Sequence, residues 1–282
     1  MNDISATTRV AAVIGWPVGH SLSPVIHNAG FRSSGIDAVY VAFAVAPGEA
    51  RGALEAARRF DLLGLSVTMP HKSDVARLVD EISPAAASLD SVNTVQFSDG
   101  RSVGHSTDGD GLVASMADTG VSVDGSRVLV IGAGGAARAV VDAMRRHGAA
   151  GVVVANRTIE NAEVAARLGP SDTRAVSLDH GLAEHAKSSD IIINCTSIGM
   201  GSSSDGGDLP ISPDLLESRH VVVDLVYHPL VTPLLRVADE IGCRTVGGLG
   251  MLIHQAALQQ EIWTGRQPDI SEMTHAARQA LG

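Results

Sequence analysis

Short apolar runs alternate along this chain with longer stretches in which apolar residues recur every three or four positions. The runs are typical of strands buried on both faces, and the longer stretches are typical of helices that cover a sheet. The predicted strands are Arg9–Ile14, Val39–Val45, Leu63–Val67, Val128–Ile131, Val152–Asn156, Ile191–Asn194, His220–Leu225 and Arg244–Val246. The predicted helices are Glu49–Phe60, Leu112–Asp118, Gly135–His147, Leu178–Lys187, Val231–Ile241, Met251–Thr264 and Ile270–Leu281, with one more ending at Leu168 and a turn at Gly247–Gly250. This alternation predicts an α/β protein with mostly parallel sheets.

Two local patterns refine this organisation. Between Leu89 and Asp108, two extended pieces flank Ser98-Asp99-Gly100, which predicts a β-hairpin. Gly120 to Gly125 is short, polar and bounded by glycines, which indicates a seam between two domains. A chain of 282 residues is long enough for two domains, each with its own core.

The stretch from Ser126 to Thr158 reads as a strand, a tight turn, a helix and a second strand. Gly132, Gly134 and Ala137 form G-x-G-x-x-A. The first glycine permits the turn, the second lets a pyrophosphate approach the backbone, and the small third residue keeps the helix close to the sheet. The motif predicts a dinucleotide site at the helix N-terminus. The alternative is a helix that merely packs tightly on a strand.

The end of the second strand of this unit bears on the choice of cofactor. NAD sites usually place an acidic residue there for the ribose 2′-hydroxyl, whereas a basic residue accommodates the 2′-phosphate of NADP. Asn156-Arg157-Thr158 stands at this place, so Arg157 favours NADP, and the nearby Glu160 weakens that inference.

Composition excludes several classes of protein. A formal net charge of −10 leaves no basic stripe for nucleic acid. Two cysteines cannot form a disulfide framework and fit a reducing compartment. The N-terminus lacks the apolar core of a signal peptide, and no apolar run is long enough for a membrane helix, so we expect a cytoplasmic protein. We expect no metal, because His20, His27 and His71 match no ligand spacing.

Polar residues gather where predicted strands pass into helices. They are Ser21, Ser23, Thr68, Lys72 and Asp108. In parallel sheets, ligands bind at the carboxyl ends of the strands, so these side chains are candidates for one site. Beside a nicotinamide cofactor, a lysine can protonate a developing alkoxide, while a carboxylate orients the lysine ammonium.

Most of these residues also have a structural explanation. Ser23 before Pro24 suits a helix cap, whereas Ser21 has no such explanation. Lys72 could be a solvated residue in a first turn, and Asp108 a helix cap.

With these residues identified, the sequence resembles the shikimate dehydrogenase family from Gly15 to Gln255. The resemblance rests on nine blocks in the family's order: GWPVGHSLSPVIHN, LSVTMPHK, VNT, STDGDG, GAGGAARA, ANRT, NCTSIGM, DLVYHPLVTPLL and GLGMLIHQ. It implies the reversible, NADP(H)-linked reduction of 3-dehydroshikimate to shikimate, in chorismate and aromatic amino-acid biosynthesis. It also implies a substrate domain over residues 1–108, a Rossmann-type NADP domain over 109–248 and a cleft between them. Helices within 249–282 would complete the first domain.

The resemblance also assigns roles by residue. Lys72 and Asp108 would be the catalytic pair. The substrate would be held by Ser21, Ser23, Thr68, Asn93, Tyr227 and Gln255. The dinucleotide would be held by Gly132, Ala133, Gly134, Gly135, Ala136, Asn156, Arg157, Thr158, Thr196, Val226 and Gly248.

Three departures from the family pattern leave alternatives open. Ser106 replaces a usual Asn, Asp90-Ser91 replaces small residues, and Asn161 stands where many NADP-using members carry a second base. One alternative is therefore a quinate/shikimate dehydrogenase that prefers NAD. Another is a dinucleotide-binding regulatory protein without turnover. The sequence leaves open a monomer or a homodimer.

Overall fold

The computed structural model describes residues 4–178, 181–201 and 208–282 of the chain, which forms two compact units. The first unit comprises Met1–Thr107 and Ile253–Gly282, and the second comprises Asp108–Leu252. Gly120–Gly125 lies inside the second unit, so the seam predicted there is wrong. The chain passes between the units at Thr107, and returns within a helix that begins before Ile253.

The first unit is built on a mixed six-stranded sheet in the order β2-β1-β3-β5-β6-β4. β1 pairs in parallel with β2 and β3, whereas β5 is antiparallel to both β3 and β6. Its elements are β1 (Arg9–Gly15), α1 (Ser23–Ser33), β2 (Ala38–Ala44), α2 (Ala50–Arg59), β3 (Gly64–Val67), α3 (Lys72–Ala76), β4 (Glu81–Ile82), α4 (Pro84–Leu89), β5 (Thr94–Ser98), β6 (Arg101–His105) and α11 (Ile270–Leu281), with most of α10 (Gly248–Thr264).

The predicted hairpin is confirmed as β5 and β6. Ser98 pairs with Arg101, and the two residues between them, Asp99 and Gly100, both have positive φ angles of 51° and 75°. Positive φ at both central positions is the mark of a type I′ turn, whose twist matches that of the strands.

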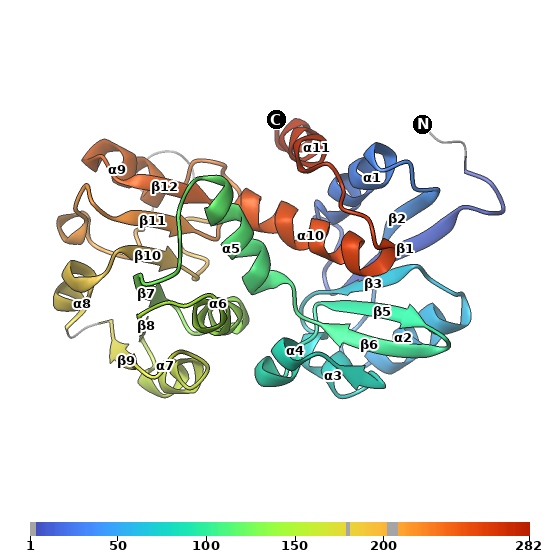
Figure 1. The fold of residues 1–282 in the computed structure, drawn as a ribbon, viewed down its shortest axis with the longest axis horizontal. Coiled ribbons are helices and arrows are strands. Elements are labelled where there is room, and N and C mark those ends of the chain that lie inside the picture. Colours follow the sequence, from blue (N-terminus) through green and yellow to red (C-terminus); the bar gives the residue numbers. More distant parts are fainter. Residues whose placement is uncertain (1–3, 179–180, 202–207) are drawn as a thin grey trace. The chain divides into compact units, whose positions relative to one another are not determined.

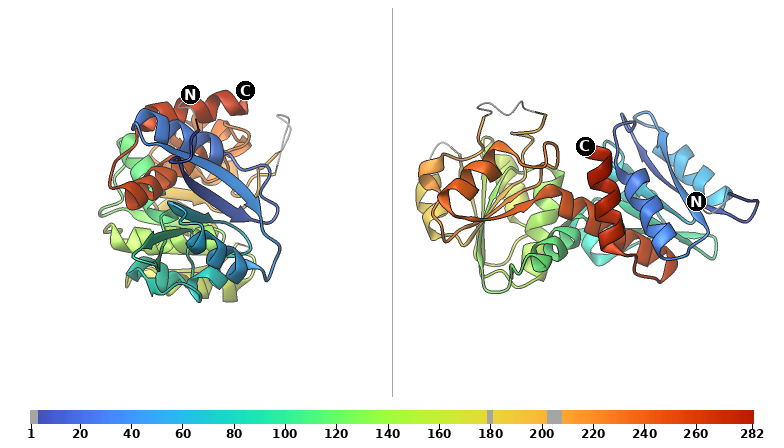
Figure 2. Two further views of the ribbon diagram at one scale, coloured as in Figure 1. Left: turned by 90° about the vertical axis from the view of Figure 1, so that its right-hand side faces the viewer. Right: turned by 90° about the horizontal axis from the view of Figure 1, so that it is seen from above.

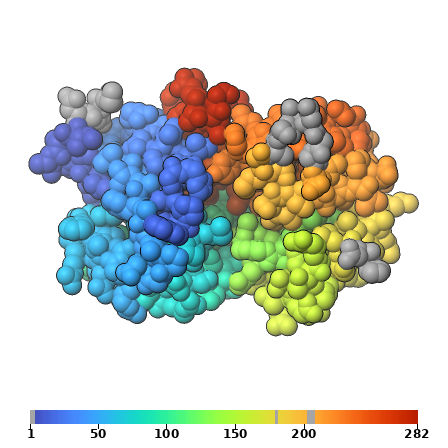
Figure 3. Space-filling model, turned by 180° about the vertical axis from the view of Figure 1, so that it is seen from behind, coloured from blue at the N-terminus to red at the C-terminus, as the bar shows by residue number. Residues whose placement is uncertain are grey.

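Each face of the first sheet is covered by different helices. Leu54 and Ala57 of α2 and Val75 of α3 pack with Leu65 and Val67 of β3 on one face. Helices α1 and α10 cover the other face, where Phe31 and Trp263 join the core of β1. Helix α11 lies beside α1 (Figure 2), so C-terminal residues pack among N-terminal ones in this unit (Figure 3).

The second unit is built on an entirely parallel six-stranded sheet in the order β12-β11-β10-β7-β8-β9. The strand order reverses beside β7, the arrangement of a dinucleotide-binding fold. Its elements are α5 (Asp108–Asp118), β7 (Arg127–Ile131), α6 (Gly135–Arg146), β8 (Gly151–Asn156), α7 (Ile159–Ala166), β9 (Thr173–Ser177), α8 (Leu182–Ser188), β10 (Ile191–Asn194), the 3₁₀ helix η1 (Pro213–Leu215), β11 (Val221–Asp224), α9 (Pro233–Ile241) and β12 (Arg244–Gly247).

Apolar side chains cover both faces of this second sheet. Helices α5, α6 and α7 pack on one face, whereas α8 and α9 pack on the other (Figure 1). Residues such as Leu129 and Val130 are therefore completely buried, although they point in opposite directions. This explains why the strands of this unit are continuous apolar runs in the sequence.

In this region the sequence analysis missed one strand and placed the start of one helix wrongly. Strand β9 was not predicted, because it is a short, half-exposed edge strand with little apolar character. The predicted helix from Leu178 begins only at Leu182, and residues 179–180 lie outside the described part of the chain.

No separate turn forms at the predicted Gly247–Gly250, because Gly247 ends β12 and Gly248 to Gly250 lie in the first turn of α10. A Cβ on Gly248 would lie 2.3 Å from the Leu225 carbonyl oxygen, and one on Gly250 would lie 2.1 Å from Ser115 Oγ. These glycines are therefore explained by close packing rather than by a turn.

Candidate active site

The predicted dinucleotide turn joins β7 to α6 in the second unit. Gly132 donates its amide hydrogen to the Ala155 carbonyl (2.8 Å) and has a φ of 108°. A Cβ there would lie 3.1 Å from Thr196 Cγ2 and 3.2 Å from the Cys195 carbonyl carbon. The fold itself therefore requires glycine at this position.

The next two glycines of the turn have a different explanation. Among the described residues, and apart from chain neighbours and the backbone of α6, a Cβ added to Gly134 or Gly135 would meet no atom within 4 Å, and Gly134 has an ordinary φ of −74°. Packing does not require glycine here, and Ala133 and Ala136 flank the same open space. Exposed amides at the start of a twelve-residue helix, with room beside them, fit a pyrophosphate.

Side chains at the end of β8 border this turn. Asn156 Nδ2 donates to the Thr158 carbonyl (2.9 Å), which holds the chain as it enters α7. Arg157 and Thr158 are exposed, and so is Asn161 in the first turn of α7. An exposed guanidinium just before a helix N-terminus is suited to a phosphate group.

A buried polar network that the sequence analysis missed shapes the ends of β10 and β11. Asp224 accepts hydrogen bonds from Asn194 Nδ2 (2.9 Å), Thr232 Oγ1 (2.6 Å) and the Val226 amide (3.1 Å). Burial raises the pKa of Asp224, and these hydrogen bonds oppose the rise. Asn194 Oδ1 in turn accepts from the Thr196 amide (3.0 Å) and Thr196 Oγ1 (2.7 Å).

This network therefore fixes the backbone at Thr196 and Val226, two positions expected near the dinucleotide. The signal in the sequence was a buried Asn and a buried Asp, each at the end of an apolar strand. The next residue, Tyr227, is half-buried, and burial raises its pKa. Gly248 packs against Leu225 and Val226, so the structure gives it a packing role, and its contact with a dinucleotide stays a prediction.

In the first unit, the structural roles of the two serines after β1 are the reverse of those expected. Helix α1 begins at Ser23, and its N-cap is Leu22, without a side-chain cap. Ser21 Oγ instead accepts the Ser23 amide hydrogen (3.2 Å). The prediction that Ser23 caps the helix is wrong, and Ser21, for which no structural role was expected, orders the turn.

Thr68, Lys72 and Asn93 are linked through the ends of β3 and β5. Thr68 donates its amide hydrogen to the Ile14 carbonyl (3.0 Å), and the Lys72 carbonyl accepts from the Val92 amide (3.0 Å). The Asn93 carbonyl accepts from the Val67 amide (2.8 Å). Because Val67 precedes Thr68 and Val92 precedes Asn93, these bonds hold the backbones of the three residues at neighbouring strand ends.

Lys72 is the first residue of α3 and is half-buried, so it is not a fully solvated residue. Asn93 is buried and donates through Nδ2 to Thr107 Oγ1 (3.0 Å), while its Oδ1 accepts from the Thr107 amide (2.9 Å). Thr107 ends the first unit, and the next residue, Asp108, begins α5 in the second. Asp108 is half-buried.

Gln255 joins this group from α10. Its Oε1 accepts a hydrogen bond from Gln259 Nε2 (2.9 Å), which also lies 3.4 Å from the Asn93 carbonyl oxygen. Gln259 was not among the predicted residues. Its spacing of four from Gln255, on one face of a helix, is the signal that could have identified it.

The histidines considered as metal ligands have other surroundings. His27 and His71 are fully buried, and His71 Nε2 lies 2.8 Å from the Val45 carbonyl oxygen. Among the described residues, no group of three or more His, Cys, Asp or Glu side chains could hold a metal ion. Nor does any helix in the described part of the chain have the length and apolar character needed to cross a membrane.

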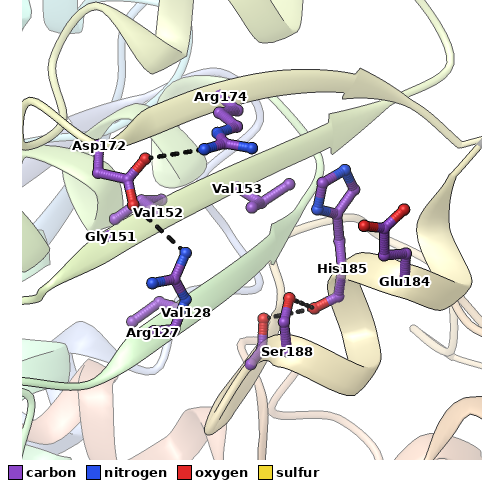
Figure 4. A pocket seen from close by; sticks show the side chains of 11 residues that line it. Arg127, Val128, Gly151, Val152, Val153, Asp172, Arg174, Glu184, His185 and Ser188 are labelled. Atoms are coloured by element: carbon purple, nitrogen blue, oxygen red, sulfur yellow. Dashed lines mark hydrogen bonds and ion pairs between the residues drawn. The ribbon is translucent and has the colours of Figure 1, made fainter.

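A separate cavity of about 200 Å³ lies at the other end of the second sheet, where β7, β8 and β9 begin. Arg127 (3.3 Å) and Arg174 (3.4 Å) both bind the carboxylate of Asp172 at its border (Figure 4). None of the predicted site residues lines it.

Taken together, the reversing parallel sheet, the glycine turn at its switch point and the open space beside Gly134 define an α/β protein with a Rossmann-type dinucleotide-binding unit. Family models match three segments of the chain. Residues 13–95 match the shikimate dehydrogenase substrate binding domain, 114–200 match shikimate / quinate 5-dehydrogenase, and 248–278 match the shikimate 5'-dehydrogenase C-terminal domain. The chain belongs to the shikimate dehydrogenase family.

Individual relatives cover nearly the full length. A shikimate dehydrogenase (NADP(+)) of Thermococcus kodakarensis is 42% identical over 276 residues, 98% of each chain. The crystal structure of the Thermus thermophilus shikimate 5-dehydrogenase in complex with NADP(H) and shikimate is 36% identical, with a TM-score of 0.87 over 97% of this chain and 100% of that one. The quinate dehydrogenase of Corynebacterium glutamicum in complex with NAD is 29% identical, with a TM-score of 0.87 over 96% and 99%.

Proposed function

We propose that this protein is a shikimate dehydrogenase that catalyses the reversible reduction of 3-dehydroshikimate to shikimate with NADPH. The observation that carries the proposal is the occurrence, in one chain, of the glycine turn with open space beside Gly134 and of the polar group around Lys72 and Asn93. Relatives named for this activity match the chain from end to end. The reaction belongs to the biosynthesis of chorismate and aromatic amino acids.

The first unit would bind the substrate, and the second would bind the cofactor. Ser21, Ser23, Thr68, Asn93 and Gln255 belong to the first unit, whereas Tyr227 would contribute from the second. The hydroxyl proton of Ser21 is suited to a carboxylate, because its oxygen already accepts the Ser23 amide. The backbone hydrogen bonds that hold Thr68, Lys72 and Asn93 against neighbouring segments fit the fixed geometry that hydride transfer requires.

NADPH, when bound, supplies the hydride for the carbonyl carbon. The Lys72 ammonium would donate a proton to the oxygen on which negative charge develops. The Asp108 carboxylate would orient this ammonium. In the oxidative direction, the neutral amine of Lys72 would accept the proton of the shikimate hydroxyl.

The 2′-phosphate of NADPH would contact Arg157. A specific observation favours NAD as a second candidate cofactor, because Asn161 provides no second positive charge in the adjacent turn. Both cysteines are free, which supports the proposal of a cytoplasmic, reducing environment. We propose a monomer or a homodimer, which sedimentation would distinguish.

Initial rates of nicotinamide reduction test the function. The purified protein is assayed with shikimate or quinate, each paired with NADP⁺ or NAD⁺. We expect the fastest turnover with shikimate and NADP⁺. Faster turnover with quinate and NAD⁺ would instead identify a quinate dehydrogenase, and no turnover in any pairing would favour a binding or regulatory protein.

A further inference from the structure

Helix α10 packs along strand β3, and three of its side chains, spaced four residues apart, lie on the side that faces the strand. Gln255, Gln259 and Trp263 share one side of the helix. Trp263 Nε1 donates to the Val95 carbonyl (3.0 Å), and its ring lies within about 2.2 Å of where a Cβ on Gly64 would be. One step along both elements, Gln259 Oε1 accepts from the hydroxyl of Ser66 (2.6 Å).

The spacing of the two elements explains this register. Two residues along a strand span about 6.6 Å, and four residues along a helix span about 6 Å. Gly64 and Ser66 project from the same face of β3, as Thr68 does beyond the strand end. The helix therefore pairs Trp263 with Gly64 and Gln259 with Ser66, and it directs Gln255 towards the end of the sheet that carries Thr68.

A buried hydroxyl of β2 extends the chain of hydrogen bonds. Tyr40 reaches across β1, where the small Ala11 lies beside it, and its hydroxyl oxygen lies 2.6 Å from Ser66 Oγ. The ring of Tyr40 stacks on His27, with centroids 4.0 Å apart and planes 2° from parallel. Tyr40 is only 1% exposed, Ser66 6% and Gln259 2%. Burial raises the pKa of Tyr40, and hydrogen bonds with Ser66 and Ser23 oppose the rise.

One backbone carbonyl fixes the direction of each hydrogen bond in this series of buried side chains. The Asn93 carbonyl can only accept, so Gln259 must turn its Nε2 towards it and its Oε1 towards Ser66. Ser66 uses its single proton for Gln259, and Tyr40 must then donate to Ser66. On the other side, Gln259 Nε2 donates to Gln255 Oε1, so the amide of Gln255 has its oxygen towards Gln259.

We propose that Tyr40, Ser66 and Gln259 are positioning residues that set the polarity of the Gln255 amide. In the resulting orientation, Gln255 directs its Nε2 as a hydrogen-bond donor towards an oxygen of the substrate ring. This inference rests on the proposed function, because it assumes that Gln255 contacts the substrate. A change at Gln259 then acts on substrate affinity only through Gln255.

A double-mutant cycle tests this mode of action, with the acid and cofactor that the unaltered chain turns over fastest. Gln259→Leu raises the KM for the acid about tenfold in the parent chain and less than about twofold in the Gln255→Ala background. The KM for the dinucleotide stays within about twofold. Gln260→Leu is the matched control, because Gln260 is also buried on α10 but bonds to His27. It leaves the KM for the acid within about twofold.

Equal increases in both backgrounds, or no increase in the parent, would overturn the positioning role while leaving the proposed function intact. Absence of turnover by the unaltered chain with all four pairs would overturn both. Should Gln259→Leu fail to fold, Tyr40→Phe removes only one oxygen. It raises the KM for the acid about threefold in the parent and leaves it unchanged in the Ser66→Ala background, whereas an equal increase in both backgrounds contradicts the proposal.

Discussion

The expected dinucleotide residues of the second unit and the expected substrate residues of the first unit are held in different ways. In the second unit, five of the expected dinucleotide residues, Gly132 to Ala136, lie where β7 turns into α6, with a φ of 108° at Gly132 and open space at Gly134. In the first unit, the expected substrate residues are side chains, and several are held by buried polar groups from segments far apart in the sequence, such as Ser66 and Gln259. Backbone sites tolerate changes in surrounding side chains, whereas a site of side chains depends on the partners that orient them.

The largest expected effect comes from a side chain of the first unit, Lys72, and it concerns the chemical step. We expect Lys72→Ala to lower kcat by at least ~100-fold, because it removes the proposed proton donor, with little change in the KM for NADP⁺. Stopped assays of shikimate oxidation measure both constants. The chain has one other lysine, the exposed Lys187 of α8, and Lys187→Ala serves as the control. Near-normal turnover of the Lys72 variant would contradict the mechanism.

The stability of the first unit should depend on pH because His27 is buried there. Burial lowers the pKa of His27 to about 3 from 6.5, so the folded chain keeps this ring neutral while the unfolded chain protonates it below pH 6.5. Stability should therefore fall as the pH falls from about 6.5 towards 3. Between pH 7 and pH 5, His27 accounts for about 2 kcal/mol of this loss.

Urea unfolding at these two pH values measures the effect. Both tryptophans, Trp16 and Trp263, belong to the first unit, so their fluorescence reports on that unit alone. In His27→Leu, the loss between pH 7 and pH 5 should be about 2 kcal/mol smaller than in the parent. An unchanged loss would mean that other groups, such as His105, whose pKa burial also lowers, account for the acid sensitivity.

The glycine turn of the second unit offers a test in which stability and binding separate. Gly134→Ala should weaken NADP⁺ binding about tenfold, because the new methyl group occupies the space beside the amides, while the thermal midpoint changes little. Gly132→Ala should lower both the affinity for NADP⁺ and the thermal midpoint, since an alanine is strained at a φ of 108°. Titration of cofactor fluorescence and thermal unfolding provide the two measurements. Unchanged binding by Gly134→Ala would remove the turn from the dinucleotide site.

The same contrast explains what the sequence could predict. The turn at Gly132 was predicted because its residues are adjacent in the chain and each has a local reason. The hairpin at Asp99-Gly100 was predicted for the same reason. Gln259 was not, because its partners Ser66 and Asn93 lie more than a hundred residues away, and only the register of α10 on β3 brings them together.

The wrong predictions at Gly247–Gly250 and Ser23 have the same origin. The first turn of α10 was misread because the need for glycine at Gly248 comes from packing on Leu225, which no local pattern encodes. Ser23 was misread as a cap because the pair Ser-Pro is typical of helix starts, whereas Ser21 orders this turn.

The smallest effect concerns the cofactor phosphate, where the second unit depends on a side chain after all. Arg157 is exposed, so its contact with a 2′-phosphate should contribute only about 1 kcal/mol. Arg157→Gln should therefore raise the KM for NADP⁺ about fivefold and leave the KM for NAD⁺ unchanged. The ratio of kcat/KM for the two cofactors, measured at low and high salt, checks this, because added salt should weaken only the contact with the phosphate.

Asn161→Arg provides the reverse test. Position 161 lies in the first turn of α7, close to Arg157, so a second guanidinium there should raise the preference for NADP⁺ by a similar factor. A cation near a helix N-terminus costs a few tenths of a kcal/mol in helix stability, which a bound phosphate would offset. If Arg157→Gln leaves the ratio unchanged while Asn161→Arg increases it, selectivity lies in the turn of α7 rather than at the end of β8. The backbone of the second unit would then bind either dinucleotide, and side chains on α7 alone would distinguish them.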